Sequence, residues 1–157
     1  MDGIQFPILF VIIAPTKIRF IMKISEALFN TLAKVAEAND EFPQARLAAA
    51  IVRNNKILSI GINRKKSDPF QARFAKNKEA IFLHAEIHAI KNALRELSVD
   101  DLKGTDLYIC RVKRPYSGAK NYVWGMAKPC CGCERAIAEF GIKNVIYSND
   151  HGKYETL

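Results

Sequence analysis

The sequence predicts a single α/β domain in which helices pack on a sheet. Apolar residues recur at helical spacing in three segments, and short runs rich in β-forming residues lie between and after them. The chain has 157 residues, enough for one well-buried core, and it shows no repeats, low-complexity segments or interdomain linker. Helices and strands in this order indicate helices layered against a sheet.

The first half of this domain is expected to hold a helix and a hairpin. Apolar spacing predicts a helix over residues 24–39. Two β-rich runs, residues 46–53 and 57–62, flank Asn54-Asn55-Lys56 and predict a β-hairpin. The polar stretch at residues 63–79 is expected to be a basic loop, with or without a short helix.

The second half is expected to alternate between helices and strands. Gly141 is placed to cap the last helix, and a turn at residues 149–152 indicates an antiparallel final strand. The predicted elements are a helix over residues 80–97, a strand over 106–112, a basic loop over 113–128, a helix from 129 to about 140, and strands over 143–148 and 153–157.

The cysteines and the charge narrow the function. Three of the four cysteines, Cys130, Cys131 and Cys133, fall within four positions, which is too close for a disulfide framework. Metal binding in a reducing cytosol fits them better, so a cytoplasmic location is expected. The net charge of +8 indicates an anionic partner, a nucleotide phosphate or a nucleic acid, unless it reflects only a solvated basic surface.

A histidine and two cysteines form a candidate zinc site. His84, Cys130 and Cys133 are suitable ligands for tetrahedral zinc, and three protein ligands leave the fourth position open for water. On a helix the two cysteines share one face, and Pro129 before them suits a first helical turn. Glu86 lies two residues after His84 and can handle protons beside a metal-bound water.

This H-x-E…P-C-x-x-C pattern resembles the cytidine/deoxycytidylate deaminase-like superfamily of zinc-dependent nucleobase deaminases, from about Lys23 to the C-terminus. The resemblance implies a three-layer α/β/α fold with a central mixed sheet of four to five strands, in which the two zinc motifs open adjacent helices. It also implies Zn²⁺ as cofactor and a homo-oligomeric assembly.

Each candidate residue has an expected role. Zinc would lower the pKa of its bound water and supply hydroxide, which attacks the carbon bearing the exocyclic amine. Glu86 would take the water proton, pass it to the ring nitrogen and help protonate the departing ammonia. The resemblance makes Asn63 a substrate-binding asparagine, although an ordinary turn residue is the alternative, and it lets the Ala85 N–H hold the base carbonyl.

Two neighbouring residues, Cys131 and His88, are candidates for a fourth ligand. Cys131 is about 100° round the helix from Cys130 and should point away from the metal. His88 lies one turn beyond His84 on the same face, and we expect it to be a hydrogen-bonded residue of the pocket or core instead.

The expected activity is hydrolytic deamination of a cytosine-type nucleoside or nucleotide, with the basic loops favouring a phosphorylated substrate such as deoxycytidylate. The first alternative is a deaminase of cytosine or adenine in single-stranded DNA or RNA, because the same loops carry aromatic residues. The second alternative is a non-catalytic zinc module that binds nucleic acid, which would have no need of Glu86.

The N-terminal stretch, residues 4–21, is strongly apolar but shorter than the roughly 20 apolar residues that span a bilayer, and it lacks the basic start of a secretory signal. No membrane association is therefore expected. An extra buried strand, an oligomer contact and an upstream extension before a working start at Met22 are the three interpretations. The last divides the chain into an extension over residues 1–22 and a zinc-dependent domain over residues 23–157.

Overall fold

The strand β1 (Ala45–Arg53) runs through the interior of the molecule. It carries an unbroken apolar run over residues 48–52, all of them buried. Alternate side chains of a strand point to opposite faces of the sheet, so such a run needs cover on both faces. Ala49 and Ile51 belong to one buried cluster, and the residues that alternate with them belong to another. Both faces of this strand are therefore covered.

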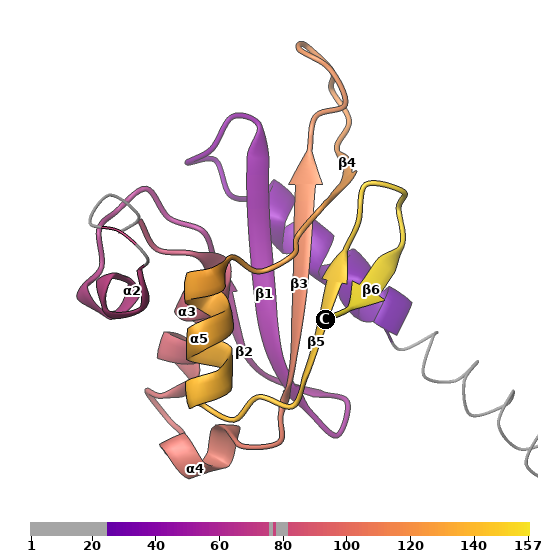
Figure 1. The fold of residues 1–157 in the computed structure, drawn as a ribbon. Helices are drawn as coiled ribbons and strands as arrows, with labels where there is room; N and C mark the ends of the chain where they lie inside the picture. The colour runs from indigo at the N-terminus through magenta and orange to yellow at the C-terminus, as the bar shows by residue number, and fades with distance from the viewer. Residues whose placement is uncertain (1–24, 76, 78–81) are drawn as a thin grey trace, which may run out of the picture.

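The computed structural model describes residues 25–75, 77 and 82–157 (Figure 1). Within them lies a mixed sheet of six strands in the order β2-β1-β3-β5-β6, with β4 paired to β3. The strands besides β1 are β2 (Lys56–Ile62), β3 (Asp106–Lys113), β4 (Val123–Gly125), β5 (Asn144–Ser148) and β6 (Tyr154–Thr156).

The pairing of the strands confirms the main features of the predicted sheet. β1 and β2 form the expected antiparallel hairpin, β3 and β5 are parallel, and β6 returns antiparallel to β5. The sheet has six strands where four to five were expected, because β4 lies in the segment expected to be a loop. A strand of three residues is too short for alternating polarity to reveal it.

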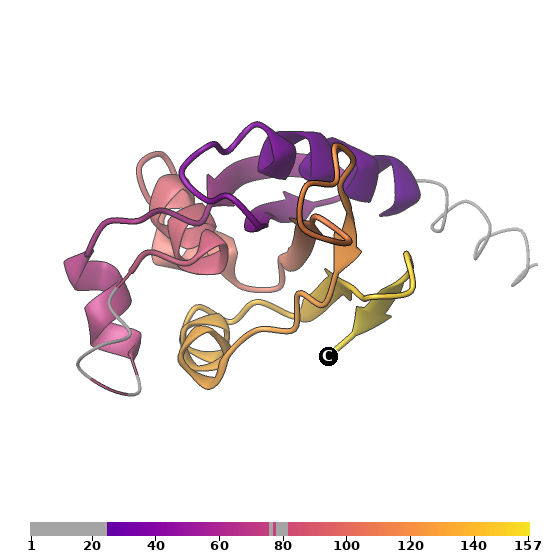
Figure 2. The same ribbon diagram turned by 90° about the horizontal axis from the view of Figure 1, so that it is seen from above.

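Helices cover both faces of the sheet, which confirms the three-layer arrangement (Figure 2). The helix over residues 25–37 covers one face. There Phe29 is fully buried and stacks on Tyr154 with ring centroids 5.0 Å apart. The helices α3 (Ala85–Ala93) and α5 (Cys131–Glu139) pack against the other face.

Both helices on this second face start later than predicted. Phe82 pairs with Ser67 in an isolated antiparallel bridge, and His84 has extended backbone as the N-cap of α3. Helical spacing could not reveal that pairing, because Ser67 lies in another part of the chain; residues 80 and 81 are outside the described residues. Cys130 is likewise the N-cap of α5, so Pro129 precedes the helix.

Two short helices complete the described chain. α2 (Pro69–Phe74) lies in the first basic loop, for which the sequence predicts a loop with or without a short helix. α4 (Val99–Leu102) was not predicted, although the Ser98 and Asp101 side chains form the reciprocal capping box that marks such a start. Gly141, with φ +68°, follows α5 as the expected cap.

No helix among the described residues is long and apolar enough to cross a membrane. The apolar N-terminal stretch and its three interpretations lie outside the described residues.

Gly61 allows α3 to approach β2, which generates a stability prediction. A Cβ at this position would lie 2.2 Å from the Ala89 nitrogen and 2.5 Å from the Ala85 oxygen, both in the backbone of α3. We expect Gly61→Ala to lower the free energy of unfolding by about 1–3 kcal/mol or more, since backbone must shift. Urea denaturation would measure it, with Lys56→Ala at the exposed start of β2 as control. Equal effects of the two substitutions would contradict this account.

Asp68 ties α2 to α3 and generates a pH prediction. Its buried carboxylate accepts the Phe70 N–H at 2.9 Å and the Lys91 ammonium at 2.5 Å, and the Lys91 bond lowers its pKa. A depressed folded pKa gives stability that is complete above the unfolded value of about 3.9 and is lost as pH falls through the folded value.

We therefore expect Asp68→Ala to cost about 0.5–2 kcal/mol of unfolding free energy at neutral pH. Asp68→Asn, which keeps a capping oxygen, should cost less. Urea titrations at about pH 7 and about pH 3 should show the deficit of Asp68→Asn shrinking in acid. A deficit that grows in acid would refute the role given to the Lys91 pair.

Candidate metal centre

Two helix N-termini bring the three predicted ligands together. His84 is the N-cap of α3, Cys130 is the N-cap of α5, and Cys133 lies in the first turn of α5. The His84 side chain makes no capping hydrogen bond to α3. The imidazole is therefore free to face the two thiols of α5 across the space between the helices.

The distances between these groups fit a zinc ion. His84 Nδ1 lies 3.6 Å from Cys130 Sγ and 3.4 Å from Cys133 Sγ, and the ligand atoms of all three residues lie within 4.8 Å of one another. Tetrahedral bonds of about 2.3 Å to sulfur and about 2.0–2.1 Å to nitrogen would place neighbouring ligand atoms about 3.6–3.8 Å apart. The cluster is therefore nearly preformed for zinc, with Nδ1 as the nitrogen that faces it.

The pKa shifts within the cluster also favour metal binding. Hydrogen bonds from Cys133 and His84 lower the pKa of the Cys130 thiol to about 3. The hydrogen bond to Cys130 raises the pKa of His84, and the neighbouring Cys130 together with burial raises that of Cys133. The three groups thus hold one sulfur as thiolate and share protons that a metal ion would displace.

Glu86 lies in the first turn of α3 beside this cluster. It is only 4% exposed, and burial raises the pKa of its carboxyl group, while the charge of His84 opposes that rise. A carboxyl group with a raised pKa can exchange a proton at a pH nearer neutrality than an exposed one.

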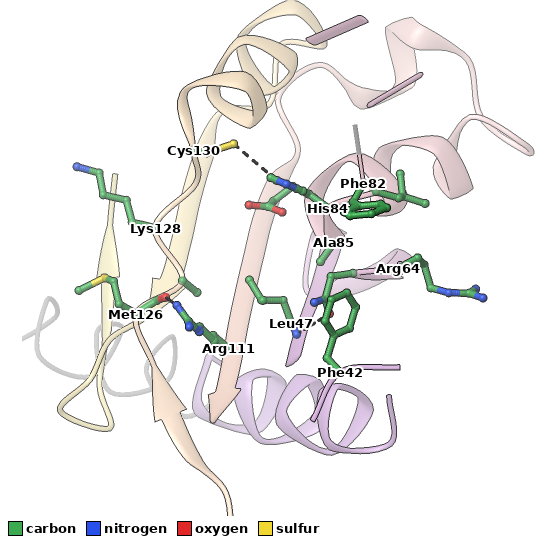
Figure 3. A pocket seen from close by; sticks show the side chains of 14 residues that line it. Phe42, Leu47, Arg64, Phe82, His84, Ala85, Arg111, Met126, Lys128 and Cys130 are labelled. Atoms are coloured by element: carbon green, nitrogen blue, oxygen red, sulfur yellow. Dashed lines mark hydrogen bonds between the residues drawn. The ribbon is translucent and has the colours of Figure 1, made fainter. Parts of the chain in front are cut away.

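A cavity of about 360 Å³ opens at the cluster (Figure 3). Its volume falls within the range of small-molecule sites. His84, Glu86 and Cys130 line it together with Asn63 and Ala85. The remaining lining residues are the apolar Phe42, Leu47, Phe82, Leu83, Met126 and Ala127 and the cationic Arg64, Arg111 and Lys128.

Asn63 and Ala85 both reach the cavity, but Asn63 also supports the fold. Its Oδ1 accepts the Leu47 N–H at 2.9 Å and an Asn39 Nδ2 hydrogen at 3.1 Å. Among the described residues, its Nδ2 makes only a long 3.4 Å contact, with the Ala45 carbonyl. The amide orientation is therefore fixed, and the amide hydrogens are the part available to a ligand. The substrate contact expected of Asn63 stays a prediction.

The two neighbours weighed as fourth ligands lie outside the cluster. Cys131 is exposed at the first position of α5. His88 Nδ1 lies 3.0 Å from the Ile62 nitrogen and 2.9 Å from the Ile62 oxygen, and burial lowers its pKa. His88 is therefore hydrogen-bonded to β2, as expected.

Among the residues of the site that sequence reasoning missed, Gln71 and Arg111 bear most directly on its geometry. Gln71 of α2 is buried and accepts the His84 N–H at 3.0 Å, which fixes the backbone of the N-cap; the local sequence carries no signal for this. Arg111 lines the cavity from β3. The sequence could have indicated Arg111, because strand alternation places it on the same face as Leu107 and Ile109, which are buried against α3 and α5.

A family model described as "Cytidine and deoxycytidylate deaminase zinc-binding region" matches residues 22–149. No curated protein matches the sequence.

Solved structures of the dCMP deaminase from the cyanophage S-TIM5 have a similar fold. The apo form matches with a TM-score of 0.52 and 24% identity over 81% of this chain and 83% of that chain. The complex with dCMP and dUMP matches with a TM-score of 0.53 and 22% identity over 81% of this chain and 82% of that chain.

The geometry predicts which cysteines retain zinc. Loss of a hydrogen bond that supports a metal ligand typically weakens metal binding by about 10–100-fold. We expect Cys130→Ser and Cys133→Ser, which remove a ligand itself, to weaken zinc binding by more than this. Cys131→Ser removes an exposed thiol from the same helix and should keep one zinc per chain. Elemental analysis after dialysis against a chelator would separate them. Zinc loss in Cys131→Ser equal to that in Cys133→Ser would refute the assignment.

Proposed function

The chain belongs to the family of the cytidine and deoxycytidylate deaminase zinc-binding region, and from this premise we propose that it hydrolytically deaminates a cytosine-type nucleoside or nucleotide. His84, Cys130 and Cys133 would hold the zinc, and Glu86 would be the catalytic acid–base. A phosphorylated, deoxycytidylate-like substrate is favoured because three cations line the cavity.

One observation carries this proposal: a buried carboxylate lies beside a three-ligand cluster that opens into a cavity. A structural zinc site closes its coordination with four protein ligands. Among the described residues only three meet here, and the burial that raises the pKa of Glu86 makes its carboxylate costly to keep beside a purely structural site. The arrangement suits catalysis better than a purely structural role.

A zinc ion at this cluster would supply a water of lowered pKa as the nucleophile. Glu86 would accept a proton from the attacking water, deliver it to the ring nitrogen of the base and then help protonate the departing amine. The carbon–nitrogen bond to the exocyclic amine breaks, the water oxygen becomes the new carbonyl oxygen, and ammonia leaves. The raised pKa of Glu86 suits a group that both takes and returns a proton.

Two further residues would position the substrate. The Ala85 N–H is at the first position of α3, where backbone donors lack helical partners, and it would hold the base carbonyl. The Oδ1 of Asn63 is held by the Leu47 N–H, so its amide hydrogens would make the contact with the sugar or base. Apolar contacts of Phe42 and Leu47 would exclude water around the base.

The alternative substrate is a base within single-stranded DNA or RNA. The observation that favours it is the segment between β3 and β4, which has no acidic residue, carries Arg114 and Lys120, and exposes 71% of Tyr116. Exposed aromatic and cationic side chains are typical of surfaces that stack single strands. A non-catalytic zinc module remains the third hypothesis, and Glu86 argues against it.

The substitution Glu86→Gln distinguishes the proposed activity from the two alternatives. Loss of an acid–base group should lower the turnover of the preferred substrate by about 10²–10⁴-fold, while the zinc content stays at the level of the unsubstituted protein. Mass spectrometry would follow cytidine, deoxycytidine, their monophosphates, adenosine and a mixed single-stranded oligonucleotide. Glu96→Gln, an exposed carboxylate beyond α3, is the matched control.

Turnover of the small cytosine compounds would support the proposal, and turnover of the oligonucleotide alone would replace it with the alternative. Full turnover by Glu86→Gln, or none by zinc-loaded protein on any compound, would refute it.

A further inference from the structure

One side of the cavity carries positive charge that the described residues do not balance. Arg64, on another side, is ion-paired with Glu41. Arg111 and Lys128 line the side formed by β3 and the segment before α5, and neither forms an ion pair with a described carboxylate (Figure 3). Asp150 is paired with Lys113, whose hydrogen bond lowers its pKa most, and the charge of Arg111 lowers that pKa further.

Arg111 has hydrogen-bonding capacity left over. Its Nη1 makes a long 3.4 Å contact with the Met126 carbonyl, and its Nε is buried without a partner among the described residues. A guanidinium offers five N–H donors in a planar fork. A buried donor of a charged group left unpaired is unfavourable, and an anionic oxygen is the partner that would satisfy it most strongly.

The position of Arg111 is built into the sheet. It pairs across the strands with Gly125, where a Cβ would come within 3.3 Å of the Arg111 Cδ and 3.4 Å of its Cγ. The Arg111 N–H donates to the buried Ser148 Oγ at 3.0 Å, and that hydroxyl donates to the Gly125 carbonyl at 2.8 Å. The Arg111 side chain therefore packs closely over Gly125, between strands joined by the hydrogen bonds of Ser148.

Lys128 adds a second positive charge, on a flexible side chain, to the fixed charge of Arg111. It is exposed, lies two residues before Cys130, and has a flexible stem that can bring its ammonium toward a ligand in the cavity. The Ala127 N–H donates to the Ser148 carbonyl at 2.9 Å, so the backbone beside Lys128 is anchored to the end of β5.

From these observations we propose that Arg111 and Lys128 form a phosphate-binding site at the side of the cavity, which recognises the phosphate attached to the sugar of the substrate. The inference rests on the proposed function, because the base would lie at Glu86 and Ala85. A forked guanidinium with a point-charge ammonium suits the tetrahedral oxygens of phosphate. The phosphate is either the monoester of a mononucleotide or a diester of a single strand.

The test measures binding, so that it does not depend on turnover. Zinc-loaded Glu86→Gln serves as the parent, and calorimetry gives its dissociation constants for dCMP, for deoxycytidine and for a short single-stranded oligonucleotide with one deoxycytidine. Arg111→Gln and Lys128→Gln are added singly and together. Lys120→Gln, which removes an exposed cation outside the cavity, is the matched control.

We expect the double substitution to weaken dCMP binding by about tenfold or more, as for lost hydrogen bonds between charged groups, and to weaken deoxycytidine binding much less. The preference for dCMP over deoxycytidine should therefore collapse, while Lys120→Gln keeps it. The same loss for the oligonucleotide but not for dCMP would identify the phosphate as a diester. Lys128→Gln changes an exposed side chain and gives a readout even if Arg111→Gln unfolds the chain.

Equal losses for dCMP and deoxycytidine would overturn the proposal, since Arg111 and Lys128 would then only shape the cavity. Unchanged affinity for both phosphorylated ligands would overturn it as well. If the binding pattern is as expected but the unsubstituted protein deaminates nothing, the phosphate site stands and the proposed function fails.

Discussion

The candidate site depends on one constraint: the N-termini of α3 and α5 must meet. Both helices pack on the same face of the sheet, and α5 connects the parallel strands β3 and β5. This packing brings His84 Nδ1 within 3.6 Å of a sulfur 46 residues away and within 3.4 Å of another 49 residues away. The close approach at Gly61 is part of the same requirement, because α3 must lie directly on β2 to place its N-cap.

The chemistry follows from the meeting of these two ends. A helix N-terminus carries unpaired N–H groups and a partial positive charge, and it favours an anion such as a thiolate or a carboxylate. Cys130 takes the thiolate role, and Glu86 lies within the first turn of α3 with a pKa raised by burial. The proposed ligands, proton carrier and substrate donor thus come from few residues, and Gln71 holds the His84 backbone from a third helix.

The sequence was sufficient for the fold class, zinc and the candidate ligands, because His84-x-Glu86 and Cys130-x-x-Cys133 are local patterns whose spacing reflects their chemistry. It was insufficient where geometry depends on distant segments. The late start of α3 comes from the Ser67–Phe82 bridge, and β4 forms only because β3 is beside it.

The same limit applies to other residues. The fixed amide of Asn63 depends on hydrogen bonds with Leu47 and Asn39. The Nε of Arg111, which has no partner in the part of the chain that the structure describes, is revealed only when the neighbouring strands are in place. The homo-oligomeric state, the domain boundary near residue 22 and the cytoplasmic location stay predictions.

The most direct test of the central claim, an open zinc site with three protein ligands, is X-ray absorption at the zinc edge of the loaded protein. The account predicts two sulfurs at about 2.3 Å, one imidazole nitrogen at about 2.0–2.1 Å and one further light atom from solvent. A shell of three or four sulfurs would contradict it, because Cys131 or Cys110 would then be a zinc ligand. Two imidazoles with two sulfurs would contradict it too, since the site would then be closed and structural.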